Sequence, residues 1–113
     1  MNPRGEAAEA LAADFVESRG LRIVARNYRC RYGELDLVAR DGETLVFIEV
    51  RRRSGEAFGG AAASIDAAKR DRLLKAARHY LAGLSAAPAC RFDAVLLSGE
   101  PPRIDWLRNI IEE

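Results

Sequence analysis

Hydrophobic positions along the first part of the chain change from a helical spacing to an alternating one. Residues 5–19 place apolar side chains three and four positions apart, from Ala8 to Phe15, which predicts one face of an amphipathic helix. Gly20 is a plausible C-cap, because glycine readily adopts the left-handed conformation that ends many helices. Residues 21–29 then alternate and predict a first strand.

Two further strands are predicted on either side of a tight turn. Residues 34–40 and 44–52 read as strands and flank Asp41-Gly42, a dipeptide typical of two-residue hairpin turns. The following residues, 53–64, are rich in Gly, Ala and Ser and predict a loop.

The rest of the chain predicts a second helix and two more strands. Asp66 is a good helix N-cap, and an apolar stripe extends from it to about Ala82. Residues 90–98 predict a strand, residues 103–107 a short last strand, and the tail a weak helix. This order, α-β-β-β-α-β-β, predicts one α/β domain over residues 1–113, with a mixed central sheet flanked by helices.

Composition excludes several classes of protein. No run approaches the roughly 18 uncharged apolar residues that a membrane span needs, so no membrane association is expected. The first residues include acids and lack a signal-peptide core, so a cytoplasmic location is expected. Cys30 and Cys90 are isolated, which predicts reduced structural thiols, and His79 is the only histidine.

The net charge of +1 gives no overall signal for nucleic acid, but the cations are unevenly distributed. Arginine and lysine cluster in residues 26–31, 51–53 and 69–78, whereas acids are concentrated in the first helix and the tail. Such asymmetry permits a basic stripe that faces a polyanion, although arginine enrichment alone is also explained by codon usage.

Acidic side chains recur at alternate positions of the two hairpin strands. Glu34 and Asp36 are expected to share one face, with Leu35 and Leu37 on the other. In the partner strand Glu49, Arg51 and Arg53 are expected to share a face. A half-buried strand has little structural reason to carry such charges, whereas a divalent metal ion and a phosphodiester provide one.

The predicted turn also fixes a register. Pairing Arg40 with Glu43 places Asp36 opposite Phe47, and Glu34 opposite Glu49. Opposed Cβ atoms would then lie about 5 Å apart, and the diagonal pair Asp36 and Glu49 roughly 7 Å apart. A slip of one residue would move Asp36 to the face away from Glu49, and the hydrophobic pattern does not exclude it.

Three carboxylates within that reach raise one another's pKa or bind a cation. Mg²⁺, or Mn²⁺ in its place, is the natural candidate, because Mg²⁺ accepts one or two carboxylates and shares a substrate phosphate. Arg51 would stand over the same site and meet the phosphate. The alternative is an exposed strand face on which Arg–Glu salt bridges form.

The chain resembles the YraN-type family of small bacterial proteins along nearly its whole length. The matching segments are Gly20-Leu21, Asn27, Gly33-Glu34-Leu35-Asp36-Leu37, Phe47-Ile48-Glu49-Val50-Arg51, Gly59-Gly60-Ala61-Ala62-Ala63-Ser64, Lys69 and Cys90-Arg91-Phe92-Asp93. That family in turn looks like the PD-(D/E)xK nuclease superfamily, in particular archaeal-type Holliday junction resolvases. The resemblance implies a restriction-endonuclease-like core.

The resemblance also implies roles for individual residues. Asp36 matches the first acid of the superfamily motif, Glu49 the second acid, and Arg51 the lysine position. Glu9 fits the acidic residue that such resolvases carry on the first helix, with an exposed helical glutamate as the alternative. Glu34 belongs to the family's G-E-x-D motif and would bind the metal directly or through water.

Arg51 departs from the superfamily pattern, which has lysine at this position. Because arginine stays protonated, it can stabilise a transition state but cannot act as a general base. The sequence therefore predicts that no neutral lysine takes part, and that Glu49 or a metal-bound water supplies the base.

Four further residues are candidate nucleic-acid contacts. Lys69 and Arg70 belong to the first turn of the second predicted helix, a region that approaches the substrate backbone in nucleases of this fold. Arg70 falls within the apolar stripe, where a snorkelling side chain is the alternative. Arg53 and Ser64 border the predicted loop, whose ordinary composition explains Ser64 equally well.

The expected function is that of a metal-dependent endonuclease that hydrolyses phosphodiester bonds in DNA, with branched DNA as a candidate substrate. The alternative is a non-catalytic nucleic-acid-binding module that retains the nuclease fold, which the near-neutral charge and Arg51 favour. A homodimer is expected only by analogy with resolvases.

Overall fold

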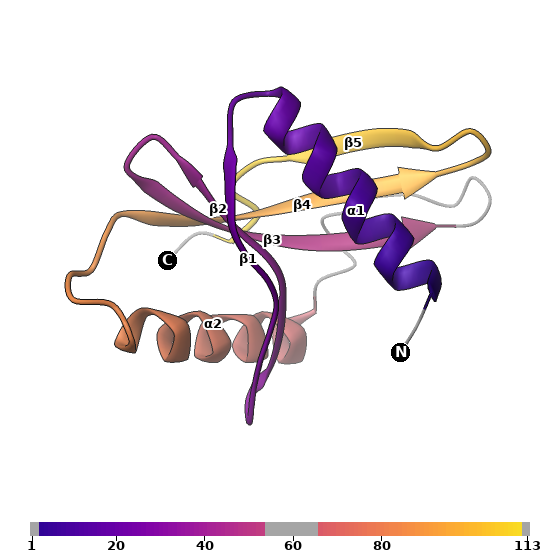
Figure 1. Ribbon diagram of the computed structural model, residues 1–113. Helices are drawn as coiled ribbons and strands as arrows, with labels where there is room; N and C mark the ends of the chain where they lie inside the picture. The colour runs from indigo at the N-terminus through magenta and orange to yellow at the C-terminus, as the bar shows by residue number, and fades with distance from the viewer. Residues whose placement is uncertain (1–2, 54–65, 112–113) are drawn as a thin grey trace.

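The computed structural model describes residues 3–53 and 66–111, and these form a five-stranded sheet with a helix on each face (Figure 1). The elements are α1 (Pro3–Ser18), β1 (Arg22–Cys30), β2 (Gly33–Asp41), β3 (Thr44–Arg53), α2 (Ala67–Ala82), β4 (Cys90–Ser98) and β5 (Arg103–Leu107). The predicted α/β class and element order are confirmed.

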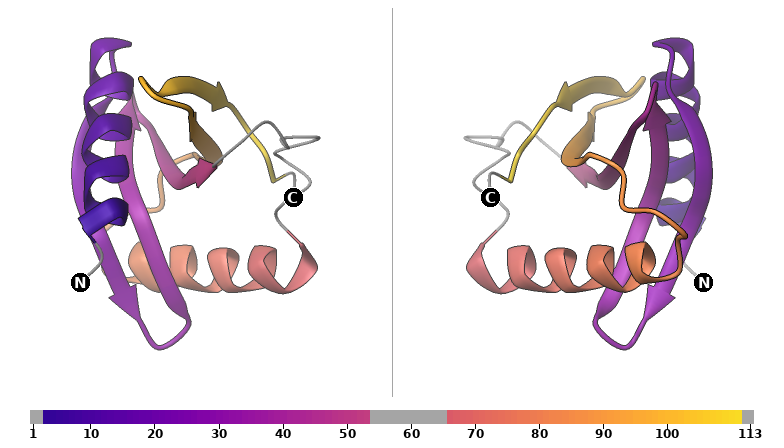
Figure 2. Two further views of the ribbon diagram at one scale, coloured as in Figure 1. Left: turned by 90° about the vertical axis from the view of Figure 1, so that its right-hand side faces the viewer. Right: turned by 90° about the vertical axis from the view of Figure 1, so that its left-hand side faces the viewer.

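The strands lie in the order in which they occur in the chain, β1-β2-β3-β4-β5. Neighbours are antiparallel except β3 and β4, which are parallel. A parallel pair needs a crossover connection, and α2 lies within that connection. Figure 2 shows α1 and α2 on opposite sides of the sheet.

Each helix covers its own hydrophobic cluster. On one face, Ala12 and Val16 of α1 pack with Leu37 of β2 and neighbouring side chains of β3 and β4. On the other, Leu73 of α2 packs with Phe47 of β3 and its neighbours. The central strands are therefore buried on both faces, as expected where helices cover both sides of a sheet. No helix among the described residues is long and apolar enough to cross a membrane.

The second half of the chain follows the predicted boundaries closely. Asp66 caps α2, because its Oδ1 accepts a hydrogen bond of 2.8 Å from the backbone N–H of Lys69. The predicted helix after β5 is wrong, since residues 108–111 have no regular structure. Asn109 adopts a left-handed conformation with φ 54°, and its N–H donates to Asp93 instead of to a helix.

The predicted hairpin register between β2 and β3 is wrong by two residues. Asp41 pairs with Thr44, so that Gly42 and Glu43 form the turn. Gly42 has a φ of 61° and so occupies the first turn position, a conformation that glycine adopts without steric cost. Asp41 remains in the strand, and its carboxylate accepts a hydrogen bond of 3.0 Å from Arg91 of β4.

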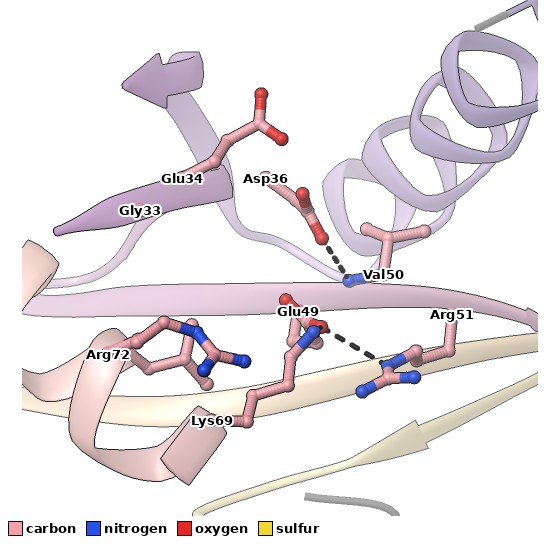
Figure 3. Close-up of a pocket in the computed structure, with 9 residues that line it drawn as sticks. Gly33, Glu34, Asp36, Glu49, Val50, Arg51, Lys69 and Arg72 are labelled. Atoms are coloured by element: carbon pink, nitrogen blue, oxygen red, sulfur yellow. Dashed lines mark hydrogen bonds and ion pairs between the residues drawn. The ribbon is translucent and has the colours of Figure 1, made fainter. Parts of the chain in front are cut away.

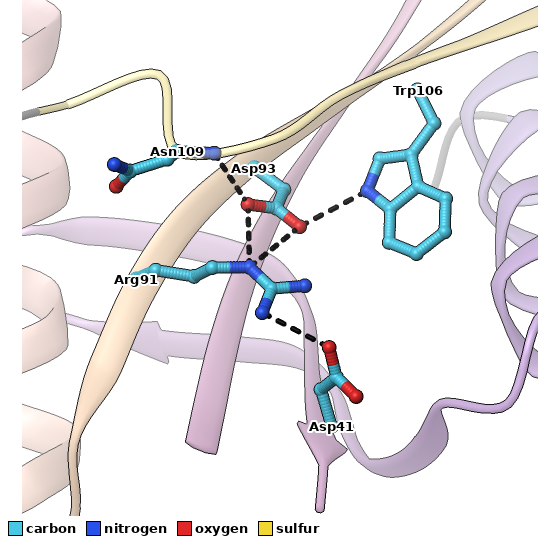
Figure 4. Close-up of polar contacts among 5 residues, drawn as sticks. All are labelled: Asp41, Arg91, Asp93, Trp106 and Asn109. Carbon is cyan, nitrogen blue, oxygen red and sulfur yellow. Dashed lines mark hydrogen bonds and ion pairs between the residues drawn. The ribbon is translucent and has the colours of Figure 1, made fainter.

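A fully buried carboxylate, Asp93 of β4, ties the C-terminal half together (Figure 4). It accepts hydrogen bonds from Trp106 Nε1 at 3.0 Å, from the Asn109 N–H at 2.8 Å, and from Arg91 Nε at 3.1 and 3.2 Å. Through Arg91 the network also reaches Asp41 at the β2–β3 turn. A buried charge is tolerated when it is paired and hydrogen-bonded in this way.

We expect Asp93→Ala to lower the free energy of unfolding by about 3–5 kcal/mol, because it leaves the Arg91 guanidinium without its buried partner. Asp105→Ala is the matched control, since the Asp105 side chain is 41% exposed and forms an ion pair with the exposed Arg103. It should cost less than about 1 kcal/mol. Urea denaturation measures both variants, and equal losses would contradict a special role for Asp93.

Candidate functional site

An open pocket of about 320 Å³ lies where β2, β3 and the start of α2 meet (Figure 3). Its lining consists of Gly33, Glu34, Asp36, Glu49, Val50, Arg51, Lys69, Arg72 and Leu73. The acids come from the two strands, and the cations come from β3 and α2. The structure thus brings five predicted site residues to one place.

Asp36 and Glu49 are brought together at the end of the β2–β3 ladder. The last ladder pair is Leu37 with Ile48, and Asp36 and Glu49 are the next residues of the two strands. The predicted pairing of Asp36 with Phe47 is therefore wrong. Because the error is two residues rather than one, the strand periodicity still keeps both acids in reach of each other.

Strict alternation of side chains fails at Asp36. Leu35 packs on the α2 side of the sheet and Leu37 on the α1 side, although the sequence predicted one face for both. Asn27, with a φ of 52°, lies between the β1 partners of these two leucines. Asparagine tolerates this left-handed conformation better than most residues. The local irregularity directs the Asp36 carboxylate toward β3, where Oδ2 accepts a 2.9 Å hydrogen bond from the Val50 N–H.

The surroundings of Asp36 favour its protonated form. Burial, followed by the negative charge of Glu49, raises the pKa of Asp36 to about 8, although the Val50 N–H opposes the shift. The pair therefore holds a proton between two carboxyl groups at neutral pH. A divalent cation would relieve the same repulsion.

Glu49 is 7% exposed, and two cations converge on its Oε2. Lys69 Nζ lies 2.5 Å away and Arg51 Nε 3.2 Å away, each on a side chain that is 28% exposed. The Arg51 Nε is buried, and within the described part of the chain it has no hydrogen-bond acceptor in good geometry. Arg51 thus keeps hydrogen-bonding capacity beside the pocket.

Lys69 changes the chemistry expected of the site. Because Arg51 occupies the usual lysine position, the sequence predicts that no neutral lysine takes part, and this stays a prediction. The structure adds a charged lysine, since the first turn of α2 places the Lys69 ammonium in an ion pair with the second acid. The cap at Asp66 fixes where α2 begins and therefore which side chain reaches Glu49.

Glu9 approaches the site from α1, as the sequence predicted. It is partly buried, and its carboxyl interacts with the side chains of Asn27 and Asp36. Burial, with the charge of Glu34 as a further contribution, raises the pKa of Glu9. Glu9 therefore adds negative potential beside the acid pair.

Glu34 lines the pocket but does not oppose Glu49, because the β2–β3 ladder ends at Leu37 and Ile48, and the residue of β2 next to that pair is Asp36. The predicted pairing of Glu34 with Glu49 is therefore wrong. Glu34 instead pairs with Arg29 on β1, and the two side chains form a 2.9 Å ion pair. Within residues 3–53 and 66–111, no three acidic, histidine or cysteine side chains are grouped as a metal site. A bound metal ion would thus rely on Asp36 and Glu49, with water and substrate completing its ligands.

The remaining predicted contacts are distributed differently. Arg70 is exposed and is not among the residues that line the pocket. Arg72 lines the pocket, and the sequence reasoning missed it, although its position three residues after Lys69 places the two on one helix face. Ser64 and the side chain of Arg53 lie outside the described residues.

Comparison with known proteins agrees with the resemblance that these motifs carry. The model of the Uncharacterised protein family UPF0102 matches residues 8–97, a range that includes Glu9 and every residue lining the pocket. The chain belongs to this family. A UPF0102 protein of Nitrosomonas europaea is 53% identical over 97% of this chain and 94% of its own length.

Two further members match this chain along nearly its whole length. The UPF0102 protein of Nitrosospira multiformis is 53% identical over 96% of this chain and 92% of its own length. That of Cupriavidus necator is 55% identical over 97% of this chain and 83% of its own. The predicted YraN-type membership is confirmed.

The pKa of Asp36 predicts how stability responds to pH. Asp36 binds its proton more tightly in the folded chain than in the unfolded chain, so the stability of the wild type falls as pH rises from about 4 to about 8. Asp36→Asn keeps an acceptor for the Val50 N–H and removes this titration. The variant should match the wild type near the lower pH limit and exceed its stability above pH 8 by up to about 5 kcal/mol, since a pKa difference of one corresponds to about 1.4 kcal/mol.

Urea denaturation at both ends of that pH range measures the difference. Asp71→Asn is the control, because Asp71 is 61% exposed and pairs with Lys75 within α2. A stability difference between Asp36→Asn and the wild type that does not change with pH would contradict the raised pKa.

Proposed function

We propose that the chain is a divalent-metal-dependent DNA endonuclease that hydrolyses phosphodiester bonds at the pocket of Asp36 and Glu49. The main support for this proposal is the acid pair itself, in which Asp36 is half-buried and Glu49 is buried. The pair lies in an open pocket that Lys69, Arg51 and Arg72 also line. Acids for a metal and cations for a phosphate are the two groups that phosphodiester hydrolysis requires. The predicted resemblance to PD-(D/E)xK nucleases supports the same residues.

The donor set fits Mg²⁺ or Mn²⁺. Both carboxyl groups supply hard oxygen ligands, and Mg²⁺ commonly takes one or two carboxylates together with waters and substrate phosphate. The two cations contact Glu49, whereas Asp36 receives the Val50 N–H and faces Glu49. Asp36 must lose its proton to bind a metal ion, so binding should strengthen as pH rises.

The protein groups divide the remaining work. When bound, Mg²⁺ would lower the pKa of a water and offset charge on the phosphate. Arg51 remains charged and can hold a phosphate oxygen through its guanidinium. Lys69, close to Glu49, can place its ammonium next to the attacking water or the developing phosphate charge. The carboxyl groups of Glu9 and Glu34 add to the negative electrostatic potential that attracts the metal ion.

A non-catalytic nucleic-acid-binding module is the second candidate. The contact of 2.5 Å between Lys69 and Glu49 favours it, because a carboxylate that is satisfied by two cations has less need of a metal ion. Such a module would bind the DNA backbone through the same cations and would not cleave it. The expected homodimer and the cytoplasmic location stay predictions.

We expect the protein to nick supercoiled plasmid and to cut a four-way or forked junction in the presence of Mg²⁺ or Mn²⁺. Asp36→Asn and Glu49→Gln should each slow cleavage by about 100-fold or more, since changes to groups that merely orient metal ligands already cost up to about this much. EDTA should abolish cleavage, and Asp105→Asn, which alters an exposed acid on β5, should not affect it.

The two candidates give different results in this assay. Cleavage that is unchanged in both acid variants would remove the proposed catalytic site. If no metal supports cleavage, but salt-dependent DNA binding persists in Asp36→Asn, the binding module is the correct function.

A further inference from the structure

The β1–β2 hairpin ends in a turn with two large side chains. Cys30 pairs with Gly33, so Arg31 and Tyr32 form the tip. Two-residue hairpin turns favour Asn and Gly, so the turn itself does not account for arginine and tyrosine here. Figures 1 and 2 show this hairpin extending past α2, and Arg31 is exposed while Tyr32 is half-buried.

Aromatic contacts fix the tip against α2. The Tyr32 ring lies edge-on to His79, with ring centroids 6.1 Å apart, and the Arg31 guanidinium lies 4.9 Å from the centre of the Tyr32 ring. Below them, the Tyr28 hydroxyl hydrogen-bonds His79 Nδ1, and the Tyr28 ring packs edge-on against Tyr80 at 5.1 Å. The surface rings of Tyr32 and His79 are therefore held by rings that continue into the core.

This aromatic surface continues into the pocket. Gly33, next to Tyr32, lines the pocket, and a Cβ added at Gly33 would lie 3.9 Å from the Arg72 Cβ. Along α2, Arg72 lies between Lys69 and His79, which are ten residues and roughly 15 Å of helix apart. One continuous face thus runs from the acid pair, past two cations, to the aromatic tip.

We propose that Arg31, Tyr32 and His79 form a base-stacking surface for an unpaired nucleotide of a DNA whose backbone crosses the pocket. Exposed aromatic rings stack on base faces, and a base face is available only where the base is unpaired or terminal. The Arg31 guanidinium lies over the Tyr32 ring and donates a hydrogen bond to its hydroxyl, so it adds a charge for phosphate and a second planar group to this surface. This inference rests on the proposed function and narrows its substrate class to DNA with a single-stranded segment, such as a fork or flap.

Fluorescence anisotropy in EDTA tests the surface without cleavage. The probes are labelled DNA oligonucleotides of one sequence, as a single strand, a continuous duplex and a forked duplex. The fork and single strand should bind more tightly than the duplex. Tyr32→Ala should weaken fork binding by roughly 5- to 100-fold and change duplex binding by less than about twofold.

Three further variants separate stacking from folding and from charge. Tyr32→Phe keeps the ring and should retain fork binding, which excludes misfolding as the cause of the loss. Arg31→Gln should weaken the binding of all three DNAs and reduce its salt dependence by the equivalent of about one phosphate contact. Arg103→Ala removes an arginine of β5 whose side chain is 78% exposed, and it should not change the binding of any of the three DNAs.

Failure of this surface and failure of the nuclease proposal give different results. If Tyr32→Ala binds the fork as the wild type does, or if the wild type binds all three DNAs equally, the stacking surface is wrong even if the protein cleaves DNA. If fork binding depends on Tyr32 but no metal supports cleavage, the surface stands and the nuclease proposal fails. If the wild type binds none of the probes at low salt, the surface is wrong.

Discussion

The arrangement of this protein depends on two carboxyl groups, Asp36 and Glu49, held next to each other at the end of a strand pair. Burial disfavours the charged form of Asp36 and strengthens its repulsion with Glu49. Together these two effects raise the pKa of Asp36 to about 8. Three features hold the pair in place: the Val50 N–H, and the Lys69 and Arg51 cations on Glu49. An arrangement that is costly for the apo fold is expected where a site is built for a ligand.

The rest of the fold positions these groups from both sides of the sheet. The irregular backbone at Asn27 turns Asp36 toward β3, and the cap at Asp66 starts α2 where Lys69 reaches the pocket. The parallel pairing of β3 with β4 and the hydrogen bonds of Asp93 keep the central strands buried. The site therefore combines a rigid sheet with side chains from both helices, as a preorganised site requires.

Local patterns predicted the elements, whereas long-range contacts decided the details of the site. Asp66 and the strand bounds were predictable because caps and periodicity are local. The turn at Gly42 was missed because tertiary contacts keep the preceding aspartate within the strand. Lys69 was expected to contact phosphate, but its contact with Glu49 joins β3 and α2, which are far apart in the sequence, and spacing in the sequence carries no signal for it.

The central claim is that Asp36 and Glu49 form a divalent-metal site, and carboxyl ¹³C NMR during titration with Mg²⁺ at neutral pH tests it most directly. We expect the Asp36 and Glu49 carboxyl signals to shift together and to saturate, with Asp36 losing its proton as Mg²⁺ binds. The buried Asp93 carboxyl serves as the internal reference and should not move. The claim would be contradicted if the Asp36 and Glu49 signals did not shift, or if they shifted no more than the signals of exposed carboxylates.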